Sequence, residues 1–420
     1  MTELKRVLGL PMLTFYGTGM ILGAGIYTVI GKAAGVAGES IWLSLIFAAF
    51  SAALSALSYA ELASMFPSVG GVYVYLGEAF PKTKWISNSS GLMMSLAGVA
   101  TSAAVALAFA GYVQHFIEFS PALIACAVLI IFTGTNILGI QETSWMNVVF
   151  TLIEVFGLLV FIYLGTQSPK FGEALYTMPT FATLSGSALI IFAYFGFENM
   201  VNFAEETKNP EKTLPRAILL SICITTILYV LVALAAISLL PIDQLAHSKA
   251  PLSDAVHPIS SKLAGALGGI ALFATANTVL IALATTSRIL YGMAKKKAVP
   301  AVFCKLHPTR QTPWVADVLI CVLSIAILPL GKVEILASIS SFATMVAFFA
   351  VHVALIVLRV QRPELERPFS VPFSFKGIPV LPVMGGLVTL LLTLQFEKTV
   401  YVVGAVFLVI IVVSQLVRKR

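Results

Sequence analysis

Long apolar segments separated by short polar ones make up nearly the whole chain. Residues 218–240 and 399–413 contain no charged residue and do not alternate apolar and polar positions as the strands of a membrane β-barrel do. An α-helix needs about 20 apolar residues to cross a bilayer. The pattern predicts an all-α polytopic membrane protein with about twelve spans, near residues 9–33, 41–66, 87–114, 121–139, 146–166, 184–204, 217–240, 266–289, 314–330, 335–358, 379–395 and 399–416.

Composition excludes most other classes of protein. The chain has 420 residues, of which 59% are hydrophobic and 11% charged, whereas a soluble domain has about 25% charged residues. The spans leave no room for a large domain outside the membrane. The sequence contains no metal-ligand cluster, nucleophile–base pair or phosphate loop, so we expect no enzyme activity, no metal and no cofactor. Its basic residues form no clustered face for nucleic acid.

The distribution of basic residues predicts the orientation. An even number of spans places both termini on one side of the membrane. If that side is the cytoplasm, 20 of the 26 Lys and Arg residues fall in inner segments, as the positive-inside rule requires. The remaining six are Lys32, Lys170, Lys249, Lys262, Lys332 and Lys398. We therefore expect an integral protein of the cell membrane (plasma or inner) with cytoplasmic N- and C-termini.

Two predicted spans have interruptions near their middles. The first contains four glycines within residues 17–25, and the sixth has Gly196 beside Glu198. Unwound backbone inside a bilayer is tolerated only where it is buried in protein or lines a cavity. Two such breaks, five spans apart, fit an inverted-repeat transporter with its binding site at the midplane. The alternatives are close helix packing at Gly19 and Gly23 and ordinary aromatic packing around Phe192.

The ends created by such breaks suit one kind of ligand. Half-helix N-termini present unpaired N–H groups and a partial positive charge, which favour a carboxylate. Free carbonyls at the opposing ends favour an ammonium group. A zwitterionic amino acid carries both groups a few ångströms apart, so it is the ligand that this arrangement predicts.

Several short motifs, in their order and spacing, resemble the amino acid–polyamine–organocation (APC) superfamily of permeases over nearly the whole chain. They are GAGIY (23–27), SYAELASMFP (58–67), GGVYVY (70–75), FAYFGFE (192–198), EETKNP (205–210), PRAI (215–218), SR (287–288), AK (294–295) and RPFSVP (367–372).

The resemblance implies a LeuT-type five-plus-five inverted repeat that takes up or exchanges amino acids by alternating access. The first repeat would comprise residues 1–166 and the second 184–358, and residues 379–420 would hold two peripheral helices and the C-terminus. Substrate carboxylate would bind the backbone amides of Ala24, Gly25 and Ile26. Its amine would bind the backbone carbonyls of Ile21, Phe192 and Phe195. The ring of Phe192 would also be a lid that closes over the substrate from outside.

Acidic residues inside spans are costly and are therefore functional candidates. Glu154 lies in the middle of the fifth span, where many permeases of this superfamily carry lysine. It is the leading candidate to carry a proton, and the alternatives are cation coordination and a fixed hydrogen-bonded structural acid. For Glu198 the resemblance implies a part in proton-linked gating. Its alternative role is to accept hydrogen bonds from N–H groups freed by the break.

Other polar residues leave two interpretations open. Thr275, Asn277 and Thr278 would either face Glu154 as an ion or polar network or join helices to one another. His352 would either titrate or pack as a polar residue in the tenth span. The charged segment after the sixth span would be either a solvated loop or an inner gate, and it contains Glu205, Glu206, Lys208, Glu211 and Lys212.

Together these observations predict a secondary active transporter that imports amino acids with protons, with sodium as the alternative coupling ion. The lack of further acids near the expected side-chain pocket favours neutral substrates. An exchanger of the same fold is the first alternative. A sensor or channel is disfavoured because the sequence shows neither an added cytoplasmic domain nor a polar pore-lining stripe.

Overall fold

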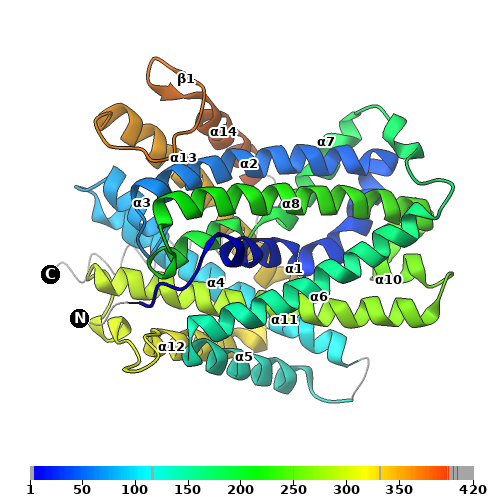
Figure 1. Ribbon diagram of the computed structural model, residues 1–420, viewed down its shortest axis with the longest axis horizontal. Coiled ribbons are helices and arrows are strands. Elements are labelled where there is room, and N and C mark those ends of the chain that lie inside the picture. Colours follow the sequence, from blue (N-terminus) through cyan, green and yellow to red (C-terminus); the bar gives the residue numbers. More distant parts are fainter. Residues whose placement is uncertain are drawn as a thin grey trace.

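The computed structural model describes residues 4–114, 118–248, 250–330, 333–394, 396, 401 and 404. Helices lying roughly along one long axis dominate it (Figure 1). The α-helices are α1 (Leu10–Ala37), α2 (Ile41–Met65), α3 (Val72–Ala79), α4 (Lys84–Val113), α5 (Pro121–Leu138), α6 (Ile140–Thr166), α7 (Phe181–Ile190), α8 (Pro210–Leu239), α9 (Ile242–His247), α10 (Pro251–Val256), α11 (Ser261–Lys295), α12 (Trp314–Ile327), α13 (Val333–Gln361) and α14 (Val380–Thr393).

Short 3₁₀ helices and one small hairpin complete the described structure. The 3₁₀ helices are η1 (Gly38–Ser40), η2 (Glu173–Tyr176), η3 (Ile191–Tyr194), η4 (Phe197–Glu206), η5 (Ala301–Cys304) and η6 (Leu328–Leu330). Strands β1 (Ser374–Phe375) and β2 (Ile378–Pro379) pair antiparallel between α13 and α14.

Nine helical segments of the described chain are long and apolar enough to cross a membrane. The apolar helices α12 and α14 have 14 residues each and are shorter than that limit. A polytopic membrane protein of mainly helical structure is therefore confirmed. The predicted twelfth span, 399–416, lies outside the described residues apart from Tyr401 and Gly404.

Helix starts and stops follow local sequence. Proline occupies the first turn of α1, α5, α8 and α10, where a missing N–H costs no hydrogen bond. Helix α1 stops before Gly38 (φ 63°), and Gly139 (φ 152°) separates α5 from α6. Both backbone conformations favour glycine.

Helix α1 lies inside the bundle, in contact with α6, α7, α8 and α11, while α4 packs on α11 and α13. The start of α1 is held beside the end of η4 by backbone hydrogen bonds. The N–H groups of Val7 and Leu8 donate to the Glu206 carbonyl (2.9 and 3.0 Å), and the Lys208 N–H donates to the Leu8 carbonyl (2.8 Å). The start of the first span therefore lies against the end of the sixth.

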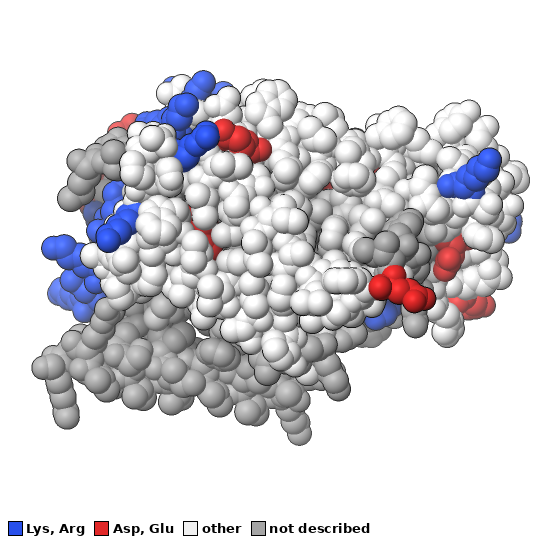
Figure 2. Space-filling view, turned by 90° about the horizontal axis from the view of Figure 1, so that it is seen from below, with Lys and Arg blue, Asp and Glu red and all other residues white. Residues whose placement is uncertain are grey.

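Charged side chains are scarce on the surface around the middle of the molecule (Figure 2). Figure 2 shows Lys and Arg gathered mainly at the end where the N-terminus lies in Figure 1, next to a broad belt almost free of charge. Large apolar side chains such as Phe156 and Tyr163 are exposed. Such a belt suits contact with lipid.

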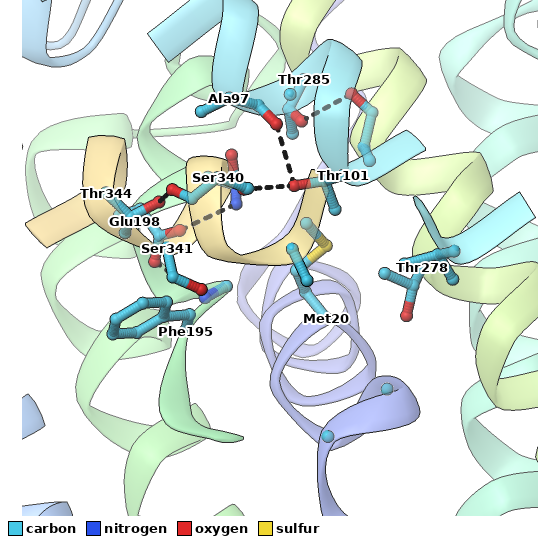
Figure 3. Close-up of a pocket in the computed structure, with 18 of the residues that line it drawn as sticks. Met20, Ala97, Thr101, Phe195, Glu198, Thr278, Thr285, Ser340, Ser341 and Thr344 are labelled. Atoms are coloured by element: carbon cyan, nitrogen blue, oxygen red, sulfur yellow. Dashed lines mark hydrogen bonds between the residues drawn. The ribbon is translucent and has the colours of Figure 1, made fainter. Parts of the chain in front are cut away.

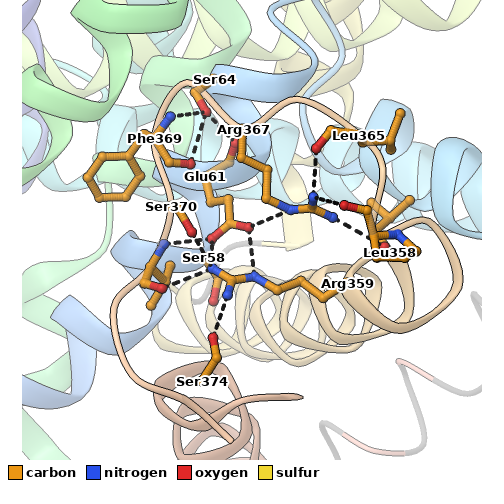
Figure 4. A network of polar contacts seen from close by, with 12 residues as sticks. Ser58, Glu61, Ser64, Leu358, Arg359, Leu365, Arg367, Phe369, Ser370 and Ser374 are labelled. Carbon is orange, nitrogen blue, oxygen red and sulfur yellow. Dashed lines mark hydrogen bonds and ion pairs between the residues drawn. The ribbon is translucent and has the colours of Figure 1, made fainter. Parts of the chain in front are cut away.

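A buried carboxylate joins α2 to α13 and to the segment that follows it (Figure 4). Glu61 accepts hydrogen bonds from the Arg359 guanidinium and from the Val371 N–H (2.7 Å), and Arg367 Nε lies 3.4 Å from its second oxygen. We call Glu61, Arg359 and Arg367 the Glu61 cluster. It brings together two of the quoted motifs, residues 58–67 and 367–372.

His352 is fully buried in α13 and both of its ring nitrogens have partners. They lie 3.1 Å from Ser55 Oγ and 2.9 Å from Ser58 Oγ, both on α2. This geometry is that of a packed polar residue joining two helices.

The Glu61→Gln substitution should destabilise the fold strongly. Removing one partner of a buried ion pair leaves the other charge uncompensated, at a cost of about 3–5 kcal/mol. Thermal unfolding of the detergent-purified protein measures this loss.

Glu78→Gln is the matched control. Glu78 pairs with Arg362 at 3.4 Å, and both side chains are partly exposed, so its loss should cost less than about 1 kcal/mol. Equal shifts in unfolding temperature for the two variants would contradict the structural importance of the Glu61 cluster.

Candidate functional site

Helix α1 is interrupted at Gly23. Its backbone has φ 20° and ψ −158° between helical segments. A Cβ at this position would lie 2.7 Å from the Thr278 hydroxyl of α11, so glycine serves both the conformation and the close approach. The predicted break in the first span is confirmed.

The sixth span breaks at Phe195 and Gly196. Helix α7 ends at Ile190, η3 continues to Tyr194, Phe195 is extended, and η4 begins at Phe197. Gly196 has φ 130°, and a Cβ there would lie 2.9 Å from the Met20 carbonyl oxygen. A side chain at this position would be strained and would also collide with α1, so the predicted second break is confirmed too.

The hydroxyl of Tyr229, on α8, connects the two breaks. It lies 2.7 Å from the Ile21 carbonyl oxygen, 3.3 Å from that of Leu22 and 3.1 Å from that of Ala193. Unwinding frees carbonyls that a continuous helix would pair, and a buried unpaired carbonyl is costly. Tyr229 meets part of this need on both segments at once. The sequence analysis did not single it out, although it is the one tyrosine of the apolar run 218–240.

A cavity of about 240 Å³ lies between the two breaks and the helices α4, α11 and α13 (Figure 3). Six of the predicted site residues line it, and they are Ile21, Gly25, Phe192, Phe195, Glu198 and Thr278. Ile26 is buried and is not among the lining residues. Ala24 is described only by its backbone, between Gly23 and Gly25.

Further lining residues come from helices that a single sequence could not orient. The apolar ones include Met20, Met94, Ala97 and Ile289, and the polar ones Thr101, Thr285, Thr286, Ser340, Ser341 and Thr344. The hydroxyls of Thr101 and Ser340 lie 2.6 Å apart and join α4 to α13 beside the cavity.

Glu198 lines the cavity with both carboxylate oxygens engaged. It accepts hydrogen bonds from the Gly196 N–H (2.8 Å) and from Asn199 Nδ2 (3.1 Å). One of these donors is a backbone group freed by the break. This is the geometry of an acid that accepts hydrogen bonds from N–H groups freed by the break, which is the alternative role predicted for Glu198.

Glu154 lies outside the cavity lining, fully buried in α6. Neither of its oxygens has a hydrogen-bond partner within the described part of the chain. It lies near enough to Tyr27 and Tyr229 to interact with them electrostatically. This electrostatic interaction links the carboxyl to the tyrosine that bridges the breaks.

The polar residues of α11 do not bond to Glu154. Thr275 donates to Ala271 and Leu272 carbonyls of its own helix, as Thr in helices often does. Thr278 donates to the Ala274 carbonyl and faces the cavity.

Asn277 instead joins helices. Its Oδ1 accepts from Asn147 Nδ2 (2.9 Å) and its Nδ2 donates to Thr151 Oγ1 (3.1 Å). Thr151 precedes Glu154 by three residues, so this network lies about one turn away from the acid. The geometry is that of an interhelical contact between α6 and α11.

Ion pairs join the end of the sixth span to α11. Glu206 is buried and binds Arg288 through two hydrogen bonds of 2.8 Å, while Glu205 pairs with Lys295 at 2.8 Å. The prediction that the charged segment after the sixth span is a solvated loop is therefore wrong for Glu206. Its carboxylate turns inward because Arg288 lies within the bundle, which sequence spacing alone could not show.

A cavity between two interrupted membrane helices, lined by residues of both breaks, is the arrangement of a substrate site in a membrane transporter. Comparison with known proteins identifies the kind of transporter. The family model of amino acid permeases matches residues 8–419, so the chain belongs to the amino acid permease family. It is a transporter and not an enzyme.

Three relatives illustrate the range of the family. The branched-chain amino acid permease BcaP of Bacillus subtilis is 32% identical over 97% of this chain and 92% of its own length. A methylthioribose transporter of the same organism is 28% identical, over 91% and 86%. A mitochondrial cationic amino acid transporter 3 of Arabidopsis thaliana is 30% identical over 87% of this chain and 64% of its own length.

The Tyr229→Phe substitution should weaken the connection between the two breaks and so impair the site that lies between them. Removing the hydroxyl leaves buried carbonyls short of a donor, at a cost of about 1–3 kcal/mol, and frees the breaks to move apart. The rate of uptake into proteoliposomes and the temperature of thermal unfolding should both fall.

Tyr194→Phe is the matched control, since Tyr194 is also buried, packs edge-on against Tyr229 and donates to the Leu45 carbonyl (3.2 Å) rather than to a break. We expect it to retain more uptake than Tyr229→Phe. Wild-type uptake and KM in Tyr229→Phe would argue against the bridging role.

Proposed function

We propose that this permease imports neutral amino acids together with protons by alternating access. The observation that carries the proposal is the cavity between the breaks at Gly23 and at Phe195–Gly196. Its walls include Gly23 and Gly25 on one side and Gly196 on the other, and the backbone groups of such breaks would meet the two charged ends of an amino acid.

The predicted contacts assign each end of the substrate. The amides of Ala24, Gly25 and Ile26 follow the break in α1 and would bind the carboxylate. Carbonyls of Ile21, Phe192 and Phe195 would bind the amine. The Ile21 carbonyl already accepts from Tyr229, but a carbonyl oxygen has two lone pairs and can accept a second donor.

The lining favours a neutral side chain. Among the described lining residues Glu198 is the one with a charge, and its oxygens are taken up by Gly196 and Asn199. Met20, Met94 and Ile289 offer apolar contact. The name of the branched-chain relative agrees with this preference, whereas the names of the cationic and methylthioribose relatives mark the alternatives that a test must include.

Proton coupling is assigned to Glu154, with Glu198 second. A buried carboxylate without a hydrogen-bond partner is costly while it is charged, so a carboxyl in this position suits the transfer of a proton. Glu154 interacts electrostatically with Tyr229, whose hydroxyl is bonded to both breaks, and this offers a route from protonation to the substrate site. Sodium is the alternative ion, and amino-acid exchange without coupling is the alternative activity.

Phe192 is assigned the role of the outer lid. It lines the central cavity and also a second hollow of about 830 Å³ bounded by α7, α13 and α14. Its ring packs edge-on against Phe195 at 5.3 Å and against Phe396 at 5.7 Å. On the other side of the site, the Glu206–Arg288 pair would close the inner path.

The proposed topology has twelve spans and a five-plus-five repeat of residues 1–166 and 184–358, followed by peripheral helices within 379–420. The breaks in α1 and between α7 and η4 stand at corresponding positions of the two repeats. Both termini are assigned to the cytoplasm because Lys and Arg gather at the N-terminal end (Figure 2).

Uptake of radiolabelled compounds into proteoliposomes tests the proposal. The panel contains leucine, valine, alanine, arginine, lysine and methylthioribose. Each compound is tested under three conditions: an imposed pH gradient, an imposed sodium gradient, and unlabelled amino acid trapped inside the vesicles. We expect leucine and valine to accumulate when the outside is acidic. Transport of arginine or methylthioribose alone would refute the assigned substrate class, and accumulation that needs only trapped amino acid would establish exchange.

Glu154→Gln separates coupling from binding. Glutamine fills nearly the same volume but holds no exchangeable acid proton, so pH-driven accumulation should be lost while counterflow exchange continues. Glu142→Gln, an exposed acid at the start of the same helix, is the control and should keep both activities. Undiminished pH-driven accumulation in Glu154→Gln would exclude this residue as the proton carrier.

A further inference from the structure

The segment between α13 and α14 ends in a hairpin with exposed aromatic side chains. Strands β1 and β2 are joined by Lys376 and Gly377, whose φ values of 49° and 82° are those of a two-residue type I′ turn. Phe373 is 74% exposed, Phe375 68% and Ile378 44%. We call Phe373, Phe375, Lys376 and Ile378 the hairpin tip.

The base of this hairpin is firmly held. Arg359 of the Glu61 cluster donates to Ser374 Oγ (2.7 Å), and the Val380 N–H donates to the Phe373 carbonyl (2.9 Å). Val371, two residues before the tip, donates to Glu61 (2.7 Å). A loose loop would not keep its aromatic rings pointing outward, whereas this base does.

Chain continuity places the tip at a membrane boundary. The apolar helix α13 ends at Gln361, and the apolar helix α14 begins at Val380, directly after β2. In Figure 1 the hairpin projects from the side of the bundle, in the half of the molecule that holds the N-terminus. It therefore stands beside the bundle, where the bilayer surface would be.

The chemistry of the tip fits that surface. Apolar residues such as Phe insert into the headgroup–acyl boundary in interfacial segments, while the ammonium group of Lys stays in water. Lys376 Nζ lies 5.7 Å from the centre of the Phe375 ring. Acidic Glu364 and Glu366 and basic Arg362 and Arg367 belong to the same segment, so apolar insertion rather than net charge would hold it.

We infer that the hairpin tip inserts into the headgroup–acyl boundary of the leaflet on the N-terminal side and anchors the ends of α2 and α13 there. The Glu61 cluster carries the anchor to both helices, because Glu61 belongs to α2 and Arg359 to α13. Helix α13 in turn lines the substrate cavity through Ser340, Ser341 and Thr344. The inserted tip thereby fixes the depth at which a wall of the site stands in the bilayer.

Spin-label accessibility tests the insertion. Cys126, Cys223, Cys304 and Cys321 are replaced by Ser, and a nitroxide is attached at F375C or at E364C, an exposed acid of the same segment. In proteoliposomes the label at 375 should be severalfold less accessible to a water-soluble nickel chelate than the label at 364, and more accessible to oxygen. Equal nickel accessibility at the two positions would overturn the proposal.

Transport tests the anchoring. The double variant F373S/F375S should lose most of its uptake in proteoliposomes while its substrate affinity in detergent stays unchanged, and F375W should keep wild-type uptake because tryptophan suits the interface. Wild-type uptake in F373S/F375S, or an equal loss of binding in detergent, would refute the anchoring role. The accessibility measurement needs no substrate, so it stands or falls independently of the proposed function.

Discussion

Every polar backbone group within a bilayer needs a partner, and this requirement governs the structure. Helices meet it along most of the chain, because each N–H and C=O is paired within the helix. At Gly23 and at Phe195–Gly196 the pairing is given up. The two breaks touch one another, share the Tyr229 hydroxyl and enclose the cavity. The interruptions therefore bring the backbone of both breaks to the cavity, where it lies beside the hydroxyl groups of α4, α11 and α13.

Buried charges are distributed according to the same rule. Glu206 is hydrogen-bonded to the oppositely charged Arg288, and Glu61 to Arg359, while Arg367 forms an ion pair with Glu61. Each pair or cluster joins helices that are far apart in sequence. Glu154 differs from them, because its carboxyl is buried without a bonded partner in the described structure. A buried charge with a partner of opposite sign stabilises one packing of the helices. A buried carboxyl without such a partner is suited to gain and lose a proton.

Polar hydroxyls add a second, weaker set of links around the cavity. The Thr101–Ser340 pair joins α4 to α13, and a net contribution of about 1 kcal/mol is typical of such a bond. The Glu61 cluster holds the same helix α13 nearer its other end with charge-assisted bonds. Charge-assisted bonds thus hold helix α13 near one end, and a weaker hydroxyl pair holds it beside the cavity.

The sequence by itself determined the class of the protein and the places of both breaks. Apolar length, the glycines of residues 17–25 and the Gly196–Glu198 pair depend on local chemistry, since a bilayer imposes helix length and glycine marks backbone that side chains would obstruct. Tertiary structure alone decided which side chains meet. Tyr229 reaches carbonyls more than thirty residues away in the chain, Asn277 pairs with Asn147 and Thr151 rather than with Glu154, and Glu206 turns inward to Arg288. These contacts depend on the rotation and packing of whole helices, and a uniformly apolar span carries little periodic signal of which face it presents to its neighbours.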